Sequence, residues 1–171
     1  MLGDPFTQPH WYALQTRSWF EKRVRDQLTA KAIVTFLPLW QQRRYWTDRV
    51  KCIELPLFRS YLFGYFTFQQ KLEVLTTVGL TRLVSFHGKP TPIPEEQIEA
   101  VRTLVARQLR YDPHPYLVEG MRVRVTHGPL AGVVGILITK KSATRLIISI
   151  ELIQRAVAVD IDSTATEVLG W

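Results

Sequence analysis

Two prolines within three positions divide this chain into parts with different hydrophobic patterns. They lie in the run Tyr111-Asp112-Pro113-His114-Pro115-Tyr116. Before this run apolar residues recur at helical spacing in several places, whereas after it helical spacing disappears. Because proline favours stiff, extended segments, the run is predicted to be a linker at 110–117. A chain of 171 residues suits one medium and one small domain, here predicted at 8–109 and 118–171.

The first part opens with the pattern of a strand followed by a helix. Residues 10–16 begin with aromatic and aliphatic side chains and are predicted to form a strand. Ser18-Trp19-Phe20-Glu21 fits a capping box, in which the serine hydroxyl and the glutamate carboxylate each accept a backbone N–H. Apolar residues then recur at every fourth position from Phe20 to Leu28, so we expect a helix that ends near residues 30–32.

The segment after this helix is predicted to form a strand and an extended arm. Residues 35–39 are β-branched and aromatic, and Pro38 favours a sheet edge or a strand end because proline cannot donate to a central ladder. Residues 41–54 are polar and basic, with a turn expected at Thr47-Asp48. We interpret this second segment as a hairpin arm.

The stretch from Leu55 to Phe68 is the most apolar in the chain. As a strand it carries Tyr61, Phe63 and Tyr65 on one face, and the residues between them are also apolar. Such a strand is either covered on both sides or leaves an aromatic face for a partner. The residues alone leave both interpretations open.

The first part ends with shorter elements and a helix. We expect a short helix at residues 69–77, a strand at 83–86, and a helix that begins at Pro94 with Glu95 and Glu96 near its positive end. The order of strands and helices predicts an α+β fold in which helices pack on an antiparallel sheet.

Four β-rich runs make up the second part. Alternation from Met121 to Val125 predicts a half-buried strand, and a glycine-rich turn at 128–132 follows. Further runs lie at 133–139, 146–152 and 156–161. Several short strands within about 55 residues favour a small β-barrel.

Positive charge is concentrated in the first third of the chain. Lysine and arginine number 22 against 15 acidic residues, for a formal net charge of +7. The segment 17–59 holds ten basic and four acidic residues, whereas residues 118–171 hold six and five. A basic patch suits a polyanion, because each neutralised phosphate releases condensed counterions. An ordinary solvated basic face is the alternative.

The sequence lacks the patterns typical of enzymes, metal sites and membrane spans. Cys52 is the single cysteine, and the four histidines have no metal-ligand spacing. Neither a phosphate-binding glycine loop nor a nucleophile elbow is present. No run of about 18 apolar residues occurs. We therefore expect a monomeric cytoplasmic protein that is not an enzyme and uses no metal or cofactor.

Three segments together resemble the NusG family of transcription factors. His10-Trp11-Tyr12-Ala13-Leu14-Gln15-Thr16 resembles the opening of the family's N-terminal (NGN) domain. Leu57-Phe58-Arg59-Ser60-Tyr61-Leu62-Phe63 resembles its aromatic motif, with Arg59-Ser60 in place of the usual proline and small residue. His127-Gly128-Pro129-Leu130-Ala131-Gly132-Val133-Val134-Gly135 is similar to the KOW motif. The resemblance implies an NGN-type α/β sandwich followed by a small SH3-like KOW β-barrel, with the compactness of RfaH-like or UpxY-like paralogues.

This resemblance implies an elongation and antitermination factor that reduces pausing or termination. In the family, the N-terminal domain binds the clamp helices of RNA polymerase through an aromatic pocket, and Tyr61, Phe63 and the adjacent Phe58 match that motif. Basic side chains of the helix and the arm would then face non-template or upstream DNA. The candidates are Arg17, Lys22, Arg23, Arg25, Arg43 and Arg44.

The KOW barrel implies a second partner, a small-subunit ribosomal protein or the termination factor Rho. We expect the glycine-rich turn to expose Leu130, with Ile150 and Ile153 as further contact positions. The alternative function is that of a ribosome-associated KOW RNA-binding protein. Such a protein should have a basic barrel, and here the barrel segment is nearly neutral.

Overall fold

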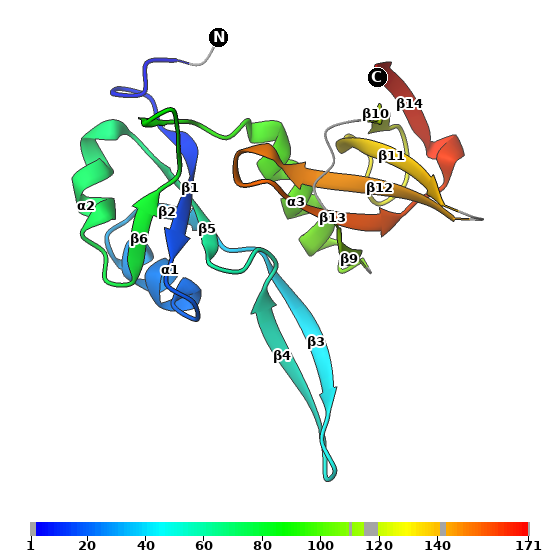
Figure 1. The fold of residues 1–171 in the computed structure, drawn as a ribbon, viewed down its shortest axis with the longest axis horizontal. Helices are drawn as coiled ribbons and strands as arrows, with labels where there is room; N and C mark the ends of the chain where they lie inside the picture. The colour runs from blue at the N-terminus through cyan, green and yellow to red at the C-terminus, as the bar shows by residue number, and fades with distance from the viewer. Residues whose placement is uncertain (1–2, 110, 115–119, 141–142, 171) are drawn as a thin grey trace. The chain divides into compact units, whose positions relative to one another are not determined.

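The computed structural model describes residues 3–109, 111–114, 120–140 and 143–170 of the chain. The chain forms two compact units, Met1–Ile93 (unit 1) and Pro94–Trp171 (unit 2), each with its own sheet (Figure 1). Each unit therefore has a main sheet of its own.

A four-stranded antiparallel sheet forms the centre of unit 1, in the order β2-β5-β1-β6. The strands are β1 (His10–Thr16), β2 (Val34–Phe36), β5 (Tyr61–Phe66) and β6 (Leu80–Leu83). β1 confirms the strand predicted at residues 10–16. β2 lies at the sheet edge and ends before Pro38, which confirms the edge position expected for that segment.

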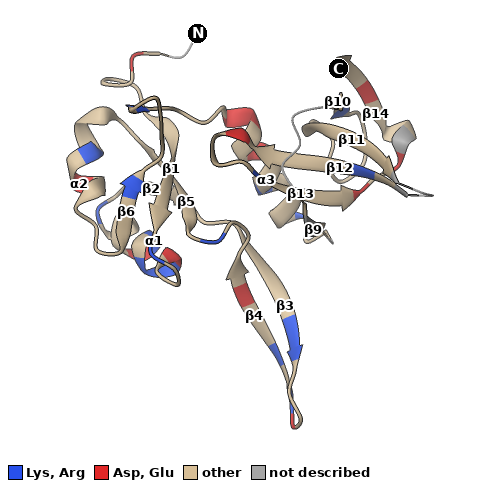
Figure 2. Cartoon of the chain, in the orientation of Figure 1, with Lys and Arg blue, Asp and Glu red and all other residues tan. Residues whose placement is uncertain are grey.

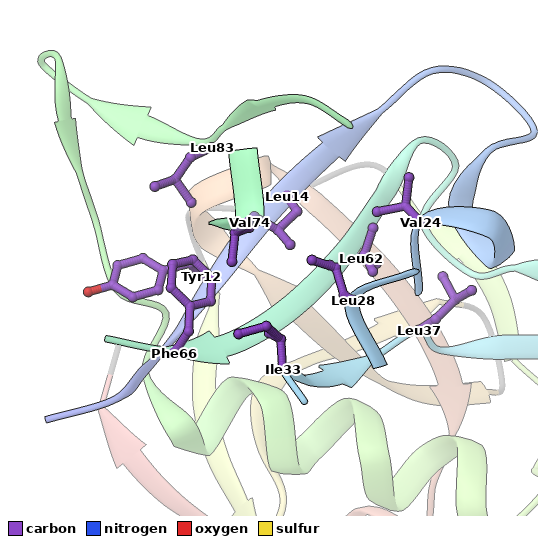
Figure 3. Close-up of a cluster of buried hydrophobic side chains, with 10 residues drawn as sticks. All are labelled: Tyr12, Leu14, Val24, Leu28, Ile33, Leu37, Leu62, Phe66, Val74 and Leu83. Carbon is purple, nitrogen blue, oxygen red and sulfur yellow. The ribbon is translucent and has the colours of Figure 1, made fainter. Parts of the chain in front are cut away.

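Two helices, α1 (Glu21–Ala30) and α2 (Lys71–Leu75), pack on this sheet (Figure 1). α1 contacts β2 and β5, and α2 contacts β6 and the short 3-10 helix η1 (Phe68–Gln70). The side chains between these helices and the sheet form a buried core (Figure 3): Tyr12, Leu14, Val24, Leu28, Ile33, Leu37, Leu62, Phe66, Val74 and Leu83. Removing this apolar surface from water stabilises unit 1.

The start of α1 differs from the prediction. Phe20 is the N-cap residue, and its side chain makes no capping hydrogen bond, so the capping box predicted at residues 18–21 is wrong. The reason is that Trp19 adopts a left-handed conformation with φ of 67°, while Glu21 uses its carboxylate elsewhere. The helix ends at Ala30, as expected.

The predicted arm is a hairpin of β3 (Leu39–Tyr45) and β4 (Val50–Pro56), which forms a two-stranded sheet of its own (Figure 1). The Trp46 N–H donates to the Arg49 carbonyl at 2.8 Å and encloses the expected turn at Thr47-Asp48. Both the strand pairing and the turn therefore confirm the prediction.

Short elements complete unit 1. β6 ends at Leu83, and β7 (Ser85–Phe86) pairs with β8 (Lys89–Pro90) in a small separate sheet. The single strand expected at 83–86 is thus divided between two sheets. The short helix expected at 69–77 is present as α2.

A six-stranded antiparallel sheet forms most of unit 2, in the order β14-β10-β11-β12-β13-β9. Its strands are β9 (Tyr111–His114), β10 (Met121–Val125), β11 (Val134–Lys140), β12 (Ala143–Ile150), β13 (Arg155–Asp160) and β14 (Thr166–Gly170). Four of them, β10 to β13, match the β-rich runs of the sequence. Ile147, Ala156 and Ala158 form a buried cluster in this sheet.

Helix α3 (Glu95–Ala106) begins directly after Pro94, as predicted, and belongs to unit 2. Ile98, Val101 and Leu104 are buried on its apolar side, and the helix contacts β11 and β12. The compact units therefore divide at Ile93 and Pro94, while the domain ranges 8–109 and 118–171 stay a prediction.

The proline-containing run is part of the sheet. Tyr111–His114 form the edge strand β9, with Tyr111 opposite Val159 and His114 opposite Ala156 of β13. An edge strand tolerates Pro113 because it needs donors on one side only. The linker prediction is wrong for these four residues, and 110 and 115–117 lie outside the described residues.

Candidate functional site

One side of the unit 1 sheet gathers six aromatic side chains, which we call the aromatic face: Trp11, Phe36, Phe58, Tyr61, Phe63 and Tyr65. Trp11, Phe58 and Phe63 are buried, and the other three are half-buried. Leu62 and Phe66 of β5 belong to the core under the helices. Since side chains alternate along a strand, Tyr61, Phe63 and Tyr65 lie on the other side of the sheet.

Neighbouring strands extend the aromatic face. Trp11 of β1 is the cross-strand partner of Tyr65, with ring centroids 5.2 Å apart. Phe36 of β2 is opposite Phe63, with their centroids 6.1 Å apart. Such pairs stabilise a sheet beyond the area they bury.

The structure brings the three predicted polymerase-binding residues together. The ring of Phe58 meets the ring of Phe63 edge-on at 6.2 Å. The Tyr61 N–H donates to the Phe58 carbonyl at 3.1 Å, which closes the turn before β5. Phe58 and Phe63 are buried, whereas Tyr61 is half-buried. Of the three, Tyr61 is therefore the one with surface for a partner.

The turn from Phe58 to Tyr61 is where the sequence departs from the family motif. Ser60 adopts a left-handed conformation with φ of 66°, which glycine adopts at no steric cost. Its N–H donates to the buried carboxylate of Glu21 at 2.8 Å. This hydrogen bond fixes the turn against α1 and so holds Tyr61 in place.

The predicted DNA-binding residues fall into two groups, one at α1 and one on the hairpin (Figure 2). Arg17, Lys22 and Arg23 are exposed in or just before α1, and the half-buried Arg25 pairs with Asp26 at 2.9 Å. Arg43 is an exposed residue of β3.

In the hairpin group, Arg44 is the next residue after Arg43 and is also exposed. The two groups are linked at the base of the hairpin, where Lys22 lies 3.8 Å from the Glu54 carboxylate.

Sequence reasoning missed three exposed aromatic residues beside these cations. Trp19 is 75% exposed, and the guanidinium of Arg59 lies 5.8 Å from its ring centroid. Tyr45 and Trp46 are exposed at the end of the hairpin. A usable signal existed in the sequence, because all three stand outside the apolar periodicity and each lies within two positions of an arginine.

The predicted KOW contact residues lie inside unit 2. Leu130, Ile150 and Ile153 are all buried, so the expectation that the glycine-rich turn exposes Leu130 is wrong. Its turn is folded back, with the Val133 N–H donating to the Leu130 carbonyl at 3.0 Å. A leucine in such a turn gains more by packing inward than by facing water. A role of these three residues in partner binding stays a prediction.

Within the described ranges, no group of three or more histidine, cysteine, aspartate or glutamate residues could hold a metal ion. Cys52 is exposed on the hairpin. Among the same described residues, no helix is long and apolar enough to cross a membrane. The recognisable surfaces are thus the aromatic face and the two basic groups.

Known proteins are similar to this chain in both of its parts. The family model described as "Transcription termination factor nusG" matches residues 9–102. A "Transcription termination/antitermination protein NusG" from Lactococcus lactis subsp. lactis (strain IL1403) is 25% identical over 169 residues, covering 89% of this chain and 89% of that protein. The protein of the same name from Campylobacter jejuni subsp. jejuni serotype O:2 (strain ATCC 700819 / NCTC 11168) is 29% identical over 136 residues, 71% of this chain and 75% of its own length.

A solved structure supports the architecture. The structure titled "Domain interaction in Thermotoga maritima NusG" has a TM-score of 0.56 and 17% sequence identity, and covers 95% of this chain and 98% of that one. At this identity the match concerns the fold alone. It confirms the fold class, an α+β NGN-type part with an antiparallel sheet followed by a small KOW-type β domain.

Proposed function

The chain belongs to the NusG family, and from that membership we propose that it is a transcription elongation and antitermination factor that binds RNA polymerase and reduces pausing or termination. It acts by binding, without catalysis, as a cytoplasmic monomer. Its compact first part favours a specialised, RfaH-like or UpxY-like role. The aromatic face of unit 1 is the observation that carries this proposal.

The polymerase-binding surface centres on Tyr61. Aromatic side chains supply much of the energy of protein interfaces, because they bury a large area with little loss of rotamer freedom. Phe58 and Phe63, buried beneath the surface, hold Tyr61 and the shape around it. The partner is an apolar helical surface of the polymerase, the clamp helices.

The basic groups bind the nucleic acid of the transcription complex. Arg17, Lys22, Arg23 and Arg25 of the α1 group and Arg43 and Arg44 of the hairpin contact non-template or upstream DNA in this proposal. Cations in two groups would contact phosphates at more than one place and so orient the protein on the complex. Affinity for the DNA should therefore fall as salt rises.

The KOW domain, proposed at 118–171 after an NGN domain at 8–109, recruits a second partner. The proposed partners are a small-subunit ribosomal protein, Rho, or both. Leu130, Ile150 and Ile153 support the contact surface from inside, since all three are buried.

Calorimetric titration of the full chain with an isolated clamp-helix fragment of RNA polymerase tests the proposal. We expect measurable binding that Tyr61→Ala weakens by about tenfold or more, the loss typical of an interface anchor. Tyr61→Phe should keep most of the affinity, because it keeps the ring. Tyr45→Ala, the same change on the hairpin, should leave this binding unchanged.

Circular dichroism of each variant separates a loss of binding from a loss of folding. If the well-folded wild-type protein does not bind the fragment, or if Tyr61→Ala binds as well as wild type, the aromatic face is not the polymerase site. The ribosome-associated RNA-binding function then becomes the better proposal. The near-neutral charge of residues 118–171 speaks against that alternative.

A further inference from the structure

Trp19, in the turn between β1 and α1, combines a strained backbone with an exposed side chain. Its φ is 67°, and 75% of the residue is exposed to solvent. This left-handed conformation is an outlier for a bulky residue, because the Cβ atom crowds the following carbonyl oxygen. Glycine would adopt it without strain, and folding gains little from a ring left in water. Backbone strain of this kind is typical of functional positions.

Arg59 lies beside the ring of Trp19. The centre of its guanidinium group is 5.8 Å from the centroid of the ring, a distance typical of a cation–π contact. Within the part of the chain that the structure describes, Arg59 forms no ion pair with a carboxylate, and it is exposed. A guanidinium group over a ring keeps the N–H groups at its edge, where they suit a carboxylate in a two-point contact.

The turn that contains Trp19 is fixed at both ends to one residue, Ser60. The Thr16 N–H, at the end of β1, donates to the Ser60 carbonyl at 2.8 Å. The Ser60 N–H donates to the carboxylate of Glu21, the first residue of α1, also at 2.8 Å. Because Ser60 directly precedes Tyr61, these two hydrogen bonds hold the turn of Trp19 against the turn that leads into Tyr61.

We propose that Trp19 and Arg59 form a second anchor of the polymerase-binding surface, next to Tyr61. In this anchor the Trp19 ring packs on an apolar side chain of the polymerase, and Arg59 pairs with a carboxylate beside it. Tryptophan, tyrosine and arginine are the residue types that contribute most to the energy of protein interfaces, and these two turns bring one of each together. The inference rests on the proposed function and adds two contact residues and the acidic character of the partner surface.

The titration of the full chain with the clamp-helix fragment tests this anchor. We expect Trp19→Gly to lose about tenfold in affinity, as is typical when an interface anchor is truncated. Its urea unfolding midpoint should stay close to that of wild type or rise, because glycine relieves the strain at this φ. Trp46→Ala, which removes an exposed tryptophan at the end of the hairpin, is the matched control and should bind like wild type.

Variants of Arg59 test the predicted ion pair. Arg59→Gln should lose about threefold in affinity and bind with less dependence on salt, because a partly exposed ion pair contributes little and is screened by salt. Arg59→Lys should lie between wild type and Arg59→Gln, since lysine keeps the charge but not the planar two-point contact.

A double variant tests whether the two residues act together. In Trp19→Gly/Arg59→Gln the fold-loss in affinity should be smaller than the product of the two single losses, because side chains that contact each other are energetically coupled. Losses that multiply without any coupling would show that Trp19 and Arg59 do not form one anchor.

Three further results would overturn the proposal. The first is Trp19→Gly binding the fragment as tightly as wild type, and if it also bound a labelled DNA duplex more weakly, the pair would belong to a nucleic-acid surface. The second is a loss of affinity in Trp19→Gly that comes with a comparable loss of stability, which would make Trp19 a structural residue. The third is Arg59→Gln with unchanged affinity and salt dependence.

The Tyr61→Ala variant separates this inference from the proposed function. If Tyr61→Ala weakens binding of the fragment and Trp19→Gly does not, only the second anchor is wrong. If the well-folded wild-type protein does not bind the fragment, the proposed polymerase site is wrong and the second anchor with it.

Discussion

The carboxylate Oε1 of Glu21 accepts a hydrogen bond from the backbone N–H of Ser60 at 2.8 Å, across 39 positions of the chain. Glu21 is only 3% exposed, although it carries a charge. This contact joins the first turn of α1 to the turn that precedes Tyr61. The positioning of the aromatic face thus depends on a residue whose sequence pattern indicates a local capping role.

Removal of the Glu21 carboxylate should destabilise the protein. Glu21→Ala leaves the Ser60 N–H without its acceptor in a part-buried place, and losing a hydrogen bond to a charged group costs about 1.5–3 kcal/mol. Urea unfolding should show this loss in the free energy of unfolding. Glu73→Ala, on the exposed side of α2, should change it by less than about 0.5 kcal/mol. Equal effects of the two changes would contradict the structural role of Glu21.

Ser60 should tolerate glycine better than a β-branched residue. With φ of 66°, an L side chain at this position is strained, and Ser60→Gly removes that strain at the cost of a more flexible unfolded chain. We expect Ser60→Gly to stay within about 1 kcal/mol of wild type and Ser60→Val to lose about 1–3 kcal/mol. Thermal unfolding of the three proteins measures the difference. A Ser60→Val protein as stable as Ser60→Gly would show that the strain is absent.

Gly135 in β11 should not accept a side chain. A Cβ built there would lie 2.5 Å from the carbonyl oxygen of Ile147, a backbone atom that cannot rotate away. Gly135→Ala should therefore destabilise unit 2 by about 1–3 kcal/mol through overpacking. Chemical unfolding followed by circular dichroism measures the loss. Thr139→Ala, an exposed change in the same strand, should be nearly neutral, and an equally neutral Gly135→Ala would contradict the close β11–β12 approach.

Stability should fall at alkaline pH in a way that depends on Tyr111. Burial raises the pKa of Tyr111 from 10.0 to about 12. Between these two values the unfolded chain has released the phenolic proton that the folded chain still holds. The unfolded state then binds fewer protons, so the free energy of unfolding decreases as pH rises.

Urea unfolding midpoints measured at several pH values between about 9 and about 11 follow this decrease, because the range spans the ordinary tyrosine pKa of about 10. Tyr111→Phe should show a smaller decrease than wild type, because it removes the titrating group. Tyr45→Phe, on a strongly exposed tyrosine, should follow the wild-type curve. A Tyr111→Phe curve parallel to wild type would show that another group causes the decrease.

Much of the secondary structure follows from local patterns. The aromatic and aliphatic opening of residues 10–16 became β1, the four-residue apolar spacing up to Leu28 became α1, and the basic stretch 41–54 became the hairpin. For α1 and the hairpin the preference is local, because a helix or a hairpin forms its backbone hydrogen bonds within a short segment. For β1 only the strand propensity is local, since its pairing partners β5 and β6 lie far away in the chain. For the candidate site, the sequence also identified Phe58, Tyr61 and Phe63, which the structure brings together.

Other outcomes depended on residues far away in the chain. Pro113 favoured a linker, but Tyr111–His114 pair with the edge of β13 and form a sixth strand. Leu130 lies in a turn rich in glycine, yet it is buried. A local sequence pattern cannot predict where a distant sheet edge or an apolar interior will lie.

The sequence by itself thus determined most of the element types, the location of the positive charge and the family of this protein. Tertiary structure alone decided that Glu21 holds the turn at Ser60, that α3 belongs to the second unit, and that Tyr45 and Trp46 are left in solvent. The physical reason is that periodicity and charge are properties of neighbouring residues, whereas burial and cross-chain hydrogen bonds depend on which distant segments meet.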